Sequence, residues 1–465
     1  MWCDDTTDVP LDNDPPAARH HMLYATGPQD DVLTNNPEYT FWKTEHAQYH
    51  SFGQEIKEYL FKDSLPDGTL KQAFGRVHTT KIPVDDADLL GPLVLQVSLP
   101  PLLQSKWFGN RRTNWIRWSY GGVLALVKKV ELVANGTILQ EFNSRILDME
   151  ANMVVSKDHQ RGYNRMTGRN ESNLALEPTF YYLPLPFWFC RTTGTSRPYL
   201  PMCALSRNVT LELRVTWEPL SSCVNANHAV SVENEDILLG DVKMTLLASI
   251  VTLDPSERML FTTANEKRYL IEEYQEQEDA IQPGTVEITK EIAISRNIKR
   301  LHWVLQDAAD VMPNTLIGNN KLRYEGYSQL FLETNYNSDG AIMYPPPIRS
   351  CQLLFSSEPR EPLGPGESTW LVSGERVDSM FYTKVQPLLY EGCNSHLKNY
   401  IFGYFFALHP FAFEPSGTYN MSATTNHLHL TLMPNLRRTN LYIYSVGYNI
   451  LKIDIDGQPS VMFAD

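Results

Sequence analysis

The chain has 465 residues, of which 42% are hydrophobic and 20% charged, a composition typical of folded domains. Its 54 acidic and 40 basic residues give a formal net charge of −14, which argues against a protein that binds a nucleic-acid backbone through a basic face. Six cysteines without a C-x-x-C pair are too few for a disulfide scaffold and indicate free thiols in a reducing compartment.

The N-terminal segment is acidic. Aspartates precede Pro15-Pro16 where a secretory signal would need an apolar core, so we predict an extended acidic arm over residues 1–37. The most apolar run, Tyr400–Phe413, is too short for a membrane span, which needs about 20 apolar residues. These features predict a soluble protein made in the cytosol.

Alternation of apolar and polar residues dominates the first domain, which we place at 38–255. In Asn208–Trp217 every second residue is apolar, as in an antiparallel strand with one buried face. Asn135-Gly136 is a preferred centre for a type I′ hairpin because both residues accept a positive φ. The predicted strands are Leu93–Leu99, Val127–Ala134, Thr137–Phe142, Asn208–Trp217 and Val242–Leu253.

A charge-dense stretch, Glu266–Asp279, separates the two halves, and we interpret 256–284 as a linker and 285–465 as the second domain. No window of 12 or more residues combines helical periodicity with caps, so helices should be short and lie in loops. The predicted strands of the second domain are Thr285–Ser295, Leu301–Leu305, Gln329–Thr334, His427–Leu432, Leu441–Val446 and Asn449–Ile453.

The two halves resemble each other at an offset of 217 residues. The aromatic pair Trp188-Phe189 precedes an alternating strand that contains Leu211, and the pair Phe405-Phe406 precedes a similar strand that contains Leu428. Self-similarity over half the chain indicates one all-β unit used twice.

One pair of residues has the spacing of metal ligands. His427 and His429 are alternate residues of a predicted strand, so both imidazoles could bind one metal, as in a duplicated cupin. The glutamate that completes the cupin motif is missing from Leu430–Thr439, and a polar strand face explains the pair better. A bicupin-like metalloenzyme is kept as an alternative.

A carbohydrate-binding or carbohydrate-cleaving β-sandwich is a further alternative. Aromatic clusters at Phe187–Phe189 and Tyr404–Phe406 could stack on sugars, although core packing accounts for them more simply. Paired carboxylates suit glycoside hydrolysis, but we interpret these ones as solvated charge or turn residues: Asp148, Glu150, Glu272, Glu273 and Glu276.

Known catalytic signatures are missing from the sequence, and we predict no catalytic residue, no metal ligand and no cofactor. Glycosylation sequons are present but weak, because such triplets arise by chance and a cytosolic chain does not meet the glycosylation machinery. The four acceptor candidates are Asn135, Asn170, Asn208 and Asn420.

Five motifs in order resemble those of one family, the double jelly-roll major capsid proteins of nucleocytoplasmic large DNA viruses (phycodnavirus-, iridovirus- or asfarvirus-like). Each motif matches a stretch of the family's sequence pattern, and together they run from Tyr24 to about Ile453. They are Tyr24–Asp30 with Asn36–Phe41, Leu183–Cys190, Leu253–Glu272, Phe406–Asn420 and Tyr448–Ile453.

The resemblance implies two consecutive eight-stranded antiparallel jelly rolls, joined by the linker and decorated with short loop helices. It further implies that three chains form a homotrimer, a pseudo-hexagonal capsomer that tiles an icosahedral shell. The implied partners are neighbouring capsomers, minor capsid and penton proteins and, through accessory proteins, an internal membrane. The chain would lie in the virion after assembly in the host cytoplasm. Asp148–Glu177 and Leu305–Tyr327 would lie on the outer face.

Overall fold

The structure is a computed structural model of residues 1–465. It divides into two compact units, Met1–His50 and Ser51–Asp465. The residues that it describes are 27–28, 36–37, 40, 42, 48–104, 116–119, 121–169, 179–191, 198–226, 237–263, 266–308, 335–336, 342–343, 347–355, 377–378, 380–390, 400–423, 425–433 and 438–463. Most of the predicted arm and the predicted strand Gln329–Thr334 lie outside them.

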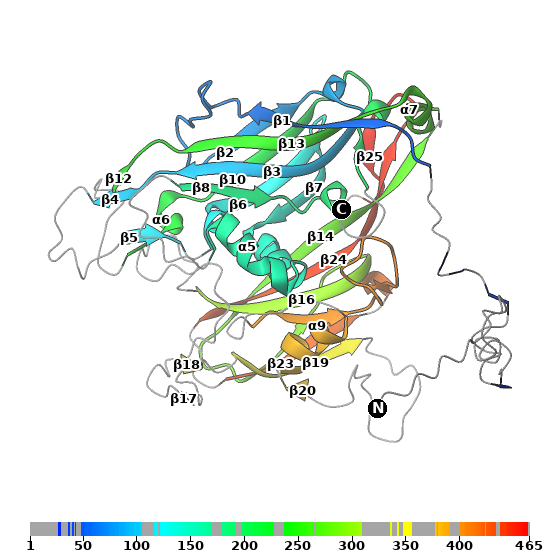
Figure 1. The fold of residues 1–465 in the computed structure, drawn as a ribbon. Helices are drawn as coiled ribbons and strands as arrows, with labels where there is room; N and C mark the ends of the chain where they lie inside the picture. The colour runs from blue at the N-terminus through cyan, green and yellow to red at the C-terminus, as the bar shows by residue number, and fades with distance from the viewer. Residues whose placement is uncertain are drawn as a thin grey trace, which may run out of the picture. The chain divides into compact units, whose positions relative to one another are not determined.

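The first barrel consists of two antiparallel sheets that face each other (Figure 1). One has the order β1-β13-β3-β8, with the short strand β9 beside β3, and the other has the order β2-β10-β6-β7. The bounds are β1 (Phe52–Leu60), β2 (Val77–Ile82), β3 (Leu89–Leu99), β6 (Val127–Ala134), β7 (Thr137–Asn143), β8 (Thr179–Pro184), β9 (Leu200–Pro201), β10 (Leu211–Trp217) and β13 (Lys243–Leu253).

The second barrel repeats this plan. Its sheets have the orders β14-β24-β16-β21, with β22 beside β16 and β25 beside β24, and β15-β23-β19-β20. The bounds are β14 (Lys267–Ile281), β15 (Glu287–Glu291), β16 (Asn297–Asp307), β19 (Ile348–Phe355), β20 (Val377–Asp378), β21 (Phe402–Phe405), β22 (Tyr419–Asn420), β23 (Asn426–Leu432), β24 (Thr439–Ile453) and β25 (Pro459–Val461).

The structural repeat confirms the sequence repeat. Strands β10 and β23, which carry Leu211 and Leu428, both lie second in a four-stranded sheet. Each barrel therefore has eight main antiparallel strands within the described residues, so the prediction of a double jelly roll is confirmed. Short pairs of strands lie outside these sheets, namely β4 (Leu102–Gln104) with β12 (Ile237–Leu239), β5 (Ile116–Trp118) with β11 (Val224–Ala226), and β17 (Asn335–Tyr336) with β18 (Ile342–Met343).

The predicted alternation is visible in burial. Along β10 every second residue is buried and the residues between are half-buried, as a one-sided strand requires. Asn135 and Gly136 have φ values of 50° and 86° and join β6 to β7, which confirms the predicted hairpin turn.

The hairpin glycine offers a test with a matched control. Nothing lies within 4 Å of a Cβ built on Gly136 or on Gly162, but only Gly136 has a positive φ. Gly136→Ala should therefore lower the free energy of unfolding by about 1 kcal/mol, whereas Gly162→Ala, within helix α5, should raise it by a few tenths to about 1 kcal/mol. Urea denaturation measures both, and equal effects of the two substitutions would contradict the turn assignment.

Helices lie in the connections between strands, as predicted. Helix α4 begins after Asn143, whose side-chain oxygen accepts hydrogen bonds from the backbone N–H groups of Arg145 and Ile146. The helices are α3 (Val123–Leu126), α4 (Ser144–Met153), α5 (Lys157–Thr167), α6 (Leu220–Cys223), α7 (Pro255–Thr262) and α9 (Gln386–Leu389), with single helical turns η1 (Val84–Asp86), η2 (Trp188–Cys190), η3 (Met202–Ala204), η4 (Phe381–Val385, π-helical) and η5 (Met421–Ala423).

Three predictions need correction. The predicted linker 256–284 contains β14, which pairs with β24 along its whole length, so this segment is part of the second barrel. The two predicted strands at Leu441–Val446 and Asn449–Ile453 are one strand, β24. The predicted strand Thr285–Ser295 is shorter in the structure. Strand β15 covers Glu287–Glu291, with one further backbone hydrogen bond to β23 at each end, at Val286 and Ile292.

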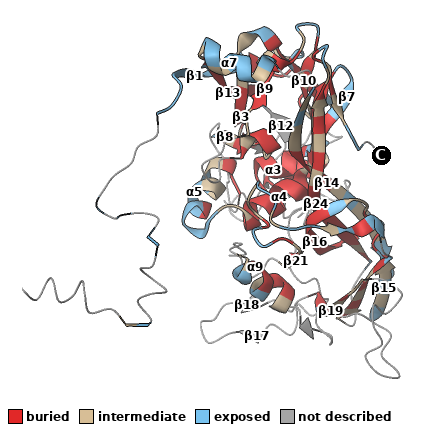
Figure 2. Cartoon of the chain, turned by 90° about the vertical axis from the view of Figure 1, so that its right-hand side faces the viewer, coloured by how far each residue is buried: buried red, intermediate tan, exposed pale blue. Residues whose placement is uncertain are grey.

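The prediction of an outer loop over Asp148–Glu177 is wrong for its first part. All ten residues of α4 are buried, and the helix lies between the two barrels (Figure 2). Leu305, where the second predicted outer stretch begins, is buried within β16, and residues 309–327 lie outside the described part. A helix that is buried on every side belongs to an interior contact rather than to an outer surface.

Candidate functional site: the interface between the barrels

The contact between the barrels is made by the sheet β14-β24-β16. One face of this sheet covers the core of the second barrel, where Leu301, Trp303 and Ile443 lie. The other face belongs to the core of the first barrel, through Tyr274, Val304, Tyr442, Tyr444 and Val446 among others. A sheet buried on both faces joins the two barrels into one packed body.

Charged side chains occupy the centre of this apolar contact. Glu272 on β14 is fully buried, lies 2.6 Å from Arg191 and also forms an ion pair with Lys299. Glu150 on α4 lies 3.2 Å from Arg191 and pairs with Arg300. Because Glu150 and Arg191 come from the first barrel and the other three from the second, the network connects the barrels by charge as well as by packing.

Several polar groups around the network are also paired. The amide of Gln140 donates to the backbone oxygen of Glu272 at 2.8 Å and accepts from the backbone N–H of Trp188 at 3.1 Å. Lys299 donates to the backbone oxygen of Ala412 at 2.9 Å. Buried charges are tolerated only with such partners, because each loses several kcal/mol of hydration.

The pKa values reflect this arrangement. Burial by itself would raise the pKa of Glu272, but the charges of Arg191 and Lys299 overcome it and lower the pKa to about 2. Burial lowers the pKa of Lys299 to about 8, although Glu272 opposes the shift. Glu272 is therefore ionised at neutral pH, as a central counter-ion for the surrounding cations.

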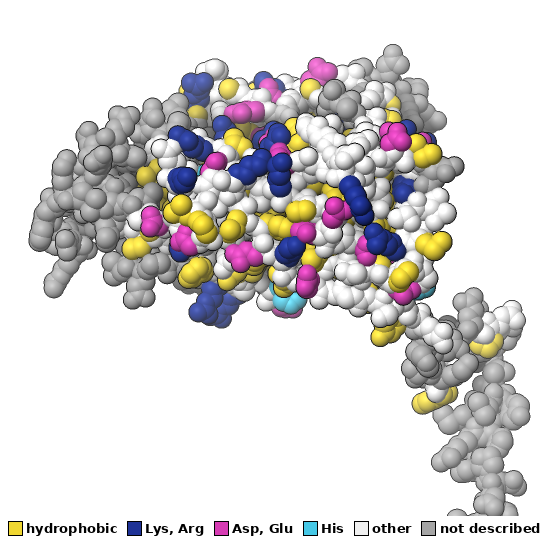
Figure 3. Space-filling view, turned by 90° about the horizontal axis from the view of Figure 1, so that it is seen from above, with side chains coloured by type: hydrophobic (Ala, Val, Ile, Leu, Met, Phe, Trp, Pro, Cys, Tyr) yellow, Lys and Arg dark blue, Asp and Glu magenta, His cyan; other side chains and the backbone are white. Residues whose placement is uncertain are grey.

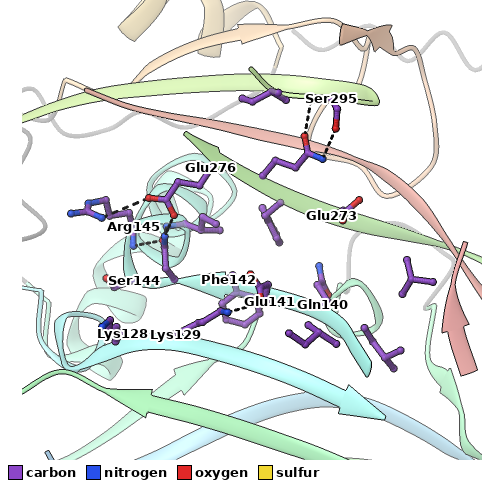
Figure 4. A pocket seen from close by; sticks show the side chains of 18 of the residues that line it. Lys128, Lys129, Gln140, Glu141, Phe142, Ser144, Arg145, Glu273, Glu276 and Ser295 are labelled. Carbon is purple, nitrogen blue, oxygen red and sulfur yellow. Dashed lines mark hydrogen bonds and ion pairs between the residues drawn. The ribbon is translucent and has the colours of Figure 1, made fainter. Parts of the chain in front are cut away.

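A second part of the interface is less tightly packed. Between β7 and β14 a cavity of about 1040 Å³ is lined by Gln140, Glu141 and Glu273 among others (Figure 4). In this cavity Glu276 extends from β14 towards Arg145 on α4, with a separation of 3.8 Å. The Arg145 guanidinium stacks on the ring of Tyr442, 3.7 Å from its centre, and connects the barrels once more.

A separate buried ion pair fixes α4 against the chain that follows α5. Arg169 lies 2.9 Å from Asp148, and both side chains are at most 1% exposed. Burial raises the pKa of Asp148 to about 6, and the charge of Arg169 opposes the shift. Asp148 and Glu150 are thus structural carboxylates in a helix, and their interpretation as turn residues was wrong.

Among the candidates for chemistry, Glu150 and Glu272 come together in the buried network through Arg191, whereas the two histidines lie apart from them on β23. His427 and His429 lie half-buried on β23, and Nδ1 of His429 is 2.8 Å from the hydroxyl of Thr289. Within the described residues, no three His, Cys, Asp or Glu side chains are placed to hold a metal ion. The rings of Phe187, Trp188 and Phe189 are at most 2% exposed, which confirms core packing.

Comparison with known proteins identifies the family. The family described as "Major capsid protein N-terminus" matches residues 40–254. The major capsid protein of Phaeocystis pouchetii virus is 24% identical over 93% of this chain and 97% of its own length. That of Paramecium bursaria Chlorella virus 1 is 25% identical over 96% and 99%.

The chain belongs to the major capsid proteins of large DNA viruses. Solved structures agree on the fold. PBCV-1 VP54 has a TM-score of 0.69 at 20% identity, and covers 92% of this chain and 100% of its own. The Faustovirus major capsid protein has a TM-score of 0.66 at 13% identity, over 91% and 94%. These relatives are structural proteins of the capsid and not enzymes.

The four described cysteines, Cys190, Cys203, Cys223 and Cys351, are free thiols, as predicted. In the described part of the chain, no helix combines the length and apolar character needed to cross a bilayer.

Three of the four sequon asparagines are described, and all three are exposed. Asn135 makes hydrogen bonds with the backbone N–H of Thr210 at 2.8 Å and with the side chain of Gln458 at 2.6 Å, so it has a structural role in its turn. Asn208 and Asn420 lie in surface positions, and Asn170 lies outside the described residues.

Sequence reasoning missed the cations of the network. Lys299 and Arg300 stand within the apolar strand β16, and Arg191 follows an aromatic run. A charge inside an apolar stretch is the available signal, because such a residue is buried only with a partner. Which partner it meets depends on contacts between residues 27 to 150 positions apart.

Proposed function

We propose that three copies of this capsid protein form a pseudo-hexagonal capsomer, and that such capsomers tile an icosahedral shell. The observation that supports this most is the internal repeat. Two barrels of the same topology are held side by side by one packed interface, so three chains supply six similar barrels. A six-sided unit with threefold symmetry can cover a flat lattice.

The proposed partners are other copies of the chain, neighbouring capsomers, minor capsid and penton proteins and, through accessory proteins, an internal membrane. We place assembly in the host cytoplasm, and the free state of Cys190, Cys203, Cys223 and Cys351 supports a reducing compartment. Direct binding of nucleic acid is not proposed, in keeping with the net charge of −14.

Two smaller assignments are proposed with the function. The chain divides into an arm (1–37), a first barrel (38–255) and a second barrel, which we start at β14 instead of residue 285 because β14 pairs with β24. Among the sequons, the exposed Asn208 is the better glycan acceptor, since Asn135 is engaged in its turn and Asn420 accepts a hydrogen bond from the backbone N–H of Ser422.

The mass in solution tests the proposed capsomer. Light scattering of the purified chain should give three times the subunit mass of 53.2 kDa, and micrographs should show hexagonal outlines. A monodisperse monomer at every concentration reached would contradict the proposal.

A further inference from the structure

An apolar stripe is exposed on the first barrel. The outward residues Phe52, Ile56 and Leu60 of β1 are 57%, 74% and 43% exposed, and Phe180 on β8 of the same sheet is 58% exposed. Seen from above, hydrophobic side chains on the described surface lie among acidic and basic ones (Figure 3). Large apolar residues exposed on one face of a sheet mark a contact surface.

The strand registers identify the counterpart of this stripe in the second barrel. Leu90 pairs with both Ile250 and Leu200 of the short strand β9. In the same way Ile298 pairs with both Gly447 and Tyr419 of the short strand β22. Ile250 and Gly447 therefore hold equivalent places in the two barrels.

One residue earlier, Ser249 pairs with Ile56 and Val446 pairs with Tyr274. Ile56 on β1 is thus equivalent to Tyr274 on β14, which is buried between the barrels of one chain. The exposed sheet face of the first barrel is the face that the second barrel uses to contact the first.

The complementary surface is exposed on the second barrel. In the first barrel the helix after β7 is α4, which is wholly buried and contacts the second barrel through Arg145 and Glu150. In the second barrel β20 is the strand equivalent to β7, because each is the last strand of its four-stranded sheet. The helical segment that follows β20 is η4 with α9. Tyr382 anchors this segment on Trp303, while Met380, Leu388 and Leu389 are 65%, 77% and 65% exposed.

The chemistry of the two exposed faces differs from that of the buried interface. In the alignment that matches Ile56 with Tyr274, Gln54 of β1 corresponds to Glu272 of β14. The side-chain amide of Gln54 donates a hydrogen bond to the hydroxyl of Ser249 at 2.8 Å. At the offset of 217 residues between the two halves, Leu408 of the second barrel corresponds to Arg191 of the first. The side chain of Leu408 is 72% exposed. An amide and an apolar side chain replace an ion pair, so these faces can meet with little loss of charge hydration.

We propose that the β1 face of one copy, defined by Phe52, Ile56 and Phe180, docks on the α9 face of a second copy, defined by Leu388, Leu389 and Leu408. The arrangement repeats the contact that joins the barrels within a chain. It is a head-to-tail contact between different surfaces, which closes into a ring when the rotation permits. This inference rests on the proposed trimer and names the surfaces that form it.

Charge placed on either face tests the inference. Ile56→Asp and Leu388→Asp should each convert the trimer to a monomer in light scattering, with near-ultraviolet circular dichroism unchanged because both side chains are exposed. The control is Val286→Asp, which is 47% exposed and precedes β15 at the edge of its sheet opposite β20, and it should remain a trimer.

The outcomes separate the inference from the function on which it rests. A wild-type trimer that both substitutions leave intact would overturn the assignment of faces but not the trimer. A wild-type chain that stays monomeric would overturn the trimer itself.

A covalent test uses two singly substituted chains. Ile56→Cys and Leu388→Cys chains, mixed under mild oxidation, should give a cross-linked dimer that neither chain gives alone and that reducing agent removes. If the two chains form trimers together but never cross-link, the proposed pairing of faces fails.

Discussion

Replacing Glu272 by Gln should destabilise the barrel pair more than any other single change at the surface between the barrels. The substitution leaves Arg191 and Lys299 buried without their shared counter-ion, and removal of one partner from a buried ion pair costs about 3–5 kcal/mol. Urea denaturation followed by tryptophan fluorescence measures the loss of free energy of unfolding.

The control for this change is Glu266→Gln, which removes an exposed carboxylate that pairs with Arg268 at 2.7 Å; it should leave the urea midpoint unchanged. The effect of pH gives a second readout. Because the pKa of Glu272 is lowered on folding, its contribution is complete above about pH 4.5 and is lost as the pH falls towards 2. Equal effects of the two substitutions at pH 7 would refute the role of the network.

The second large effect is expected for Arg169→Met. At pH 7.5 the change leaves the Asp148 carboxylate buried without its cation, at a cost of about 3–5 kcal/mol in the free energy of unfolding. At pH 5 the cost should be clearly smaller, because Asp148 can then take up a proton. Thermal unfolding at the two pH values measures the difference.

The direction of this pH dependence follows from the direction in which folding shifts the pKa of Asp148. Asp148 has a raised pKa of about 6 in the folded chain, so the folded state holds its proton more tightly than the unfolded state does. Its contribution is therefore most favourable at low pH and is lost as the pH rises through 6. The exposed Arg165 on α5 supplies the control, since Arg165→Met should show no such dependence on pH. If Arg169→Met lowers the free energy of unfolding by the same amount at both pH values, this account is contradicted.

The sequence predicts the barrels well where one face of a strand is wet. In β10 and β23 the polar residues between apolar ones face outwards, so periodicity identifies the strands directly. In β16 the residues from Ile298 to Asp307 are all buried, and the predicted strand was shorter than the real one. A strand covered on both faces loses its alternation.

Charge was the least reliable guide to the interface. In β14 the stretch Glu266–Asp279 looked like a solvated linker, because its six carboxylates outnumber its two cations, Lys267 and Arg268. The partners of Glu272 are Arg191 and Lys299, and Arg191 lies 81 positions earlier in the chain. Local composition cannot reveal a counter-ion supplied by the other barrel.

The place of β24 in its sheet has a consequence for the order in which the chain folds. This strand lies between β14 and β16, yet it begins only at Thr439, whereas the first barrel has all its main strands once β13 ends at Leu253. During synthesis the first barrel can fold while the second still lacks its central strand. Until then the face of the first barrel that packs on Tyr442, Tyr444 and Val446 of β24 lacks its cover, so the nascent chain has a period in which a chaperone that shields this surface would prevent aggregation.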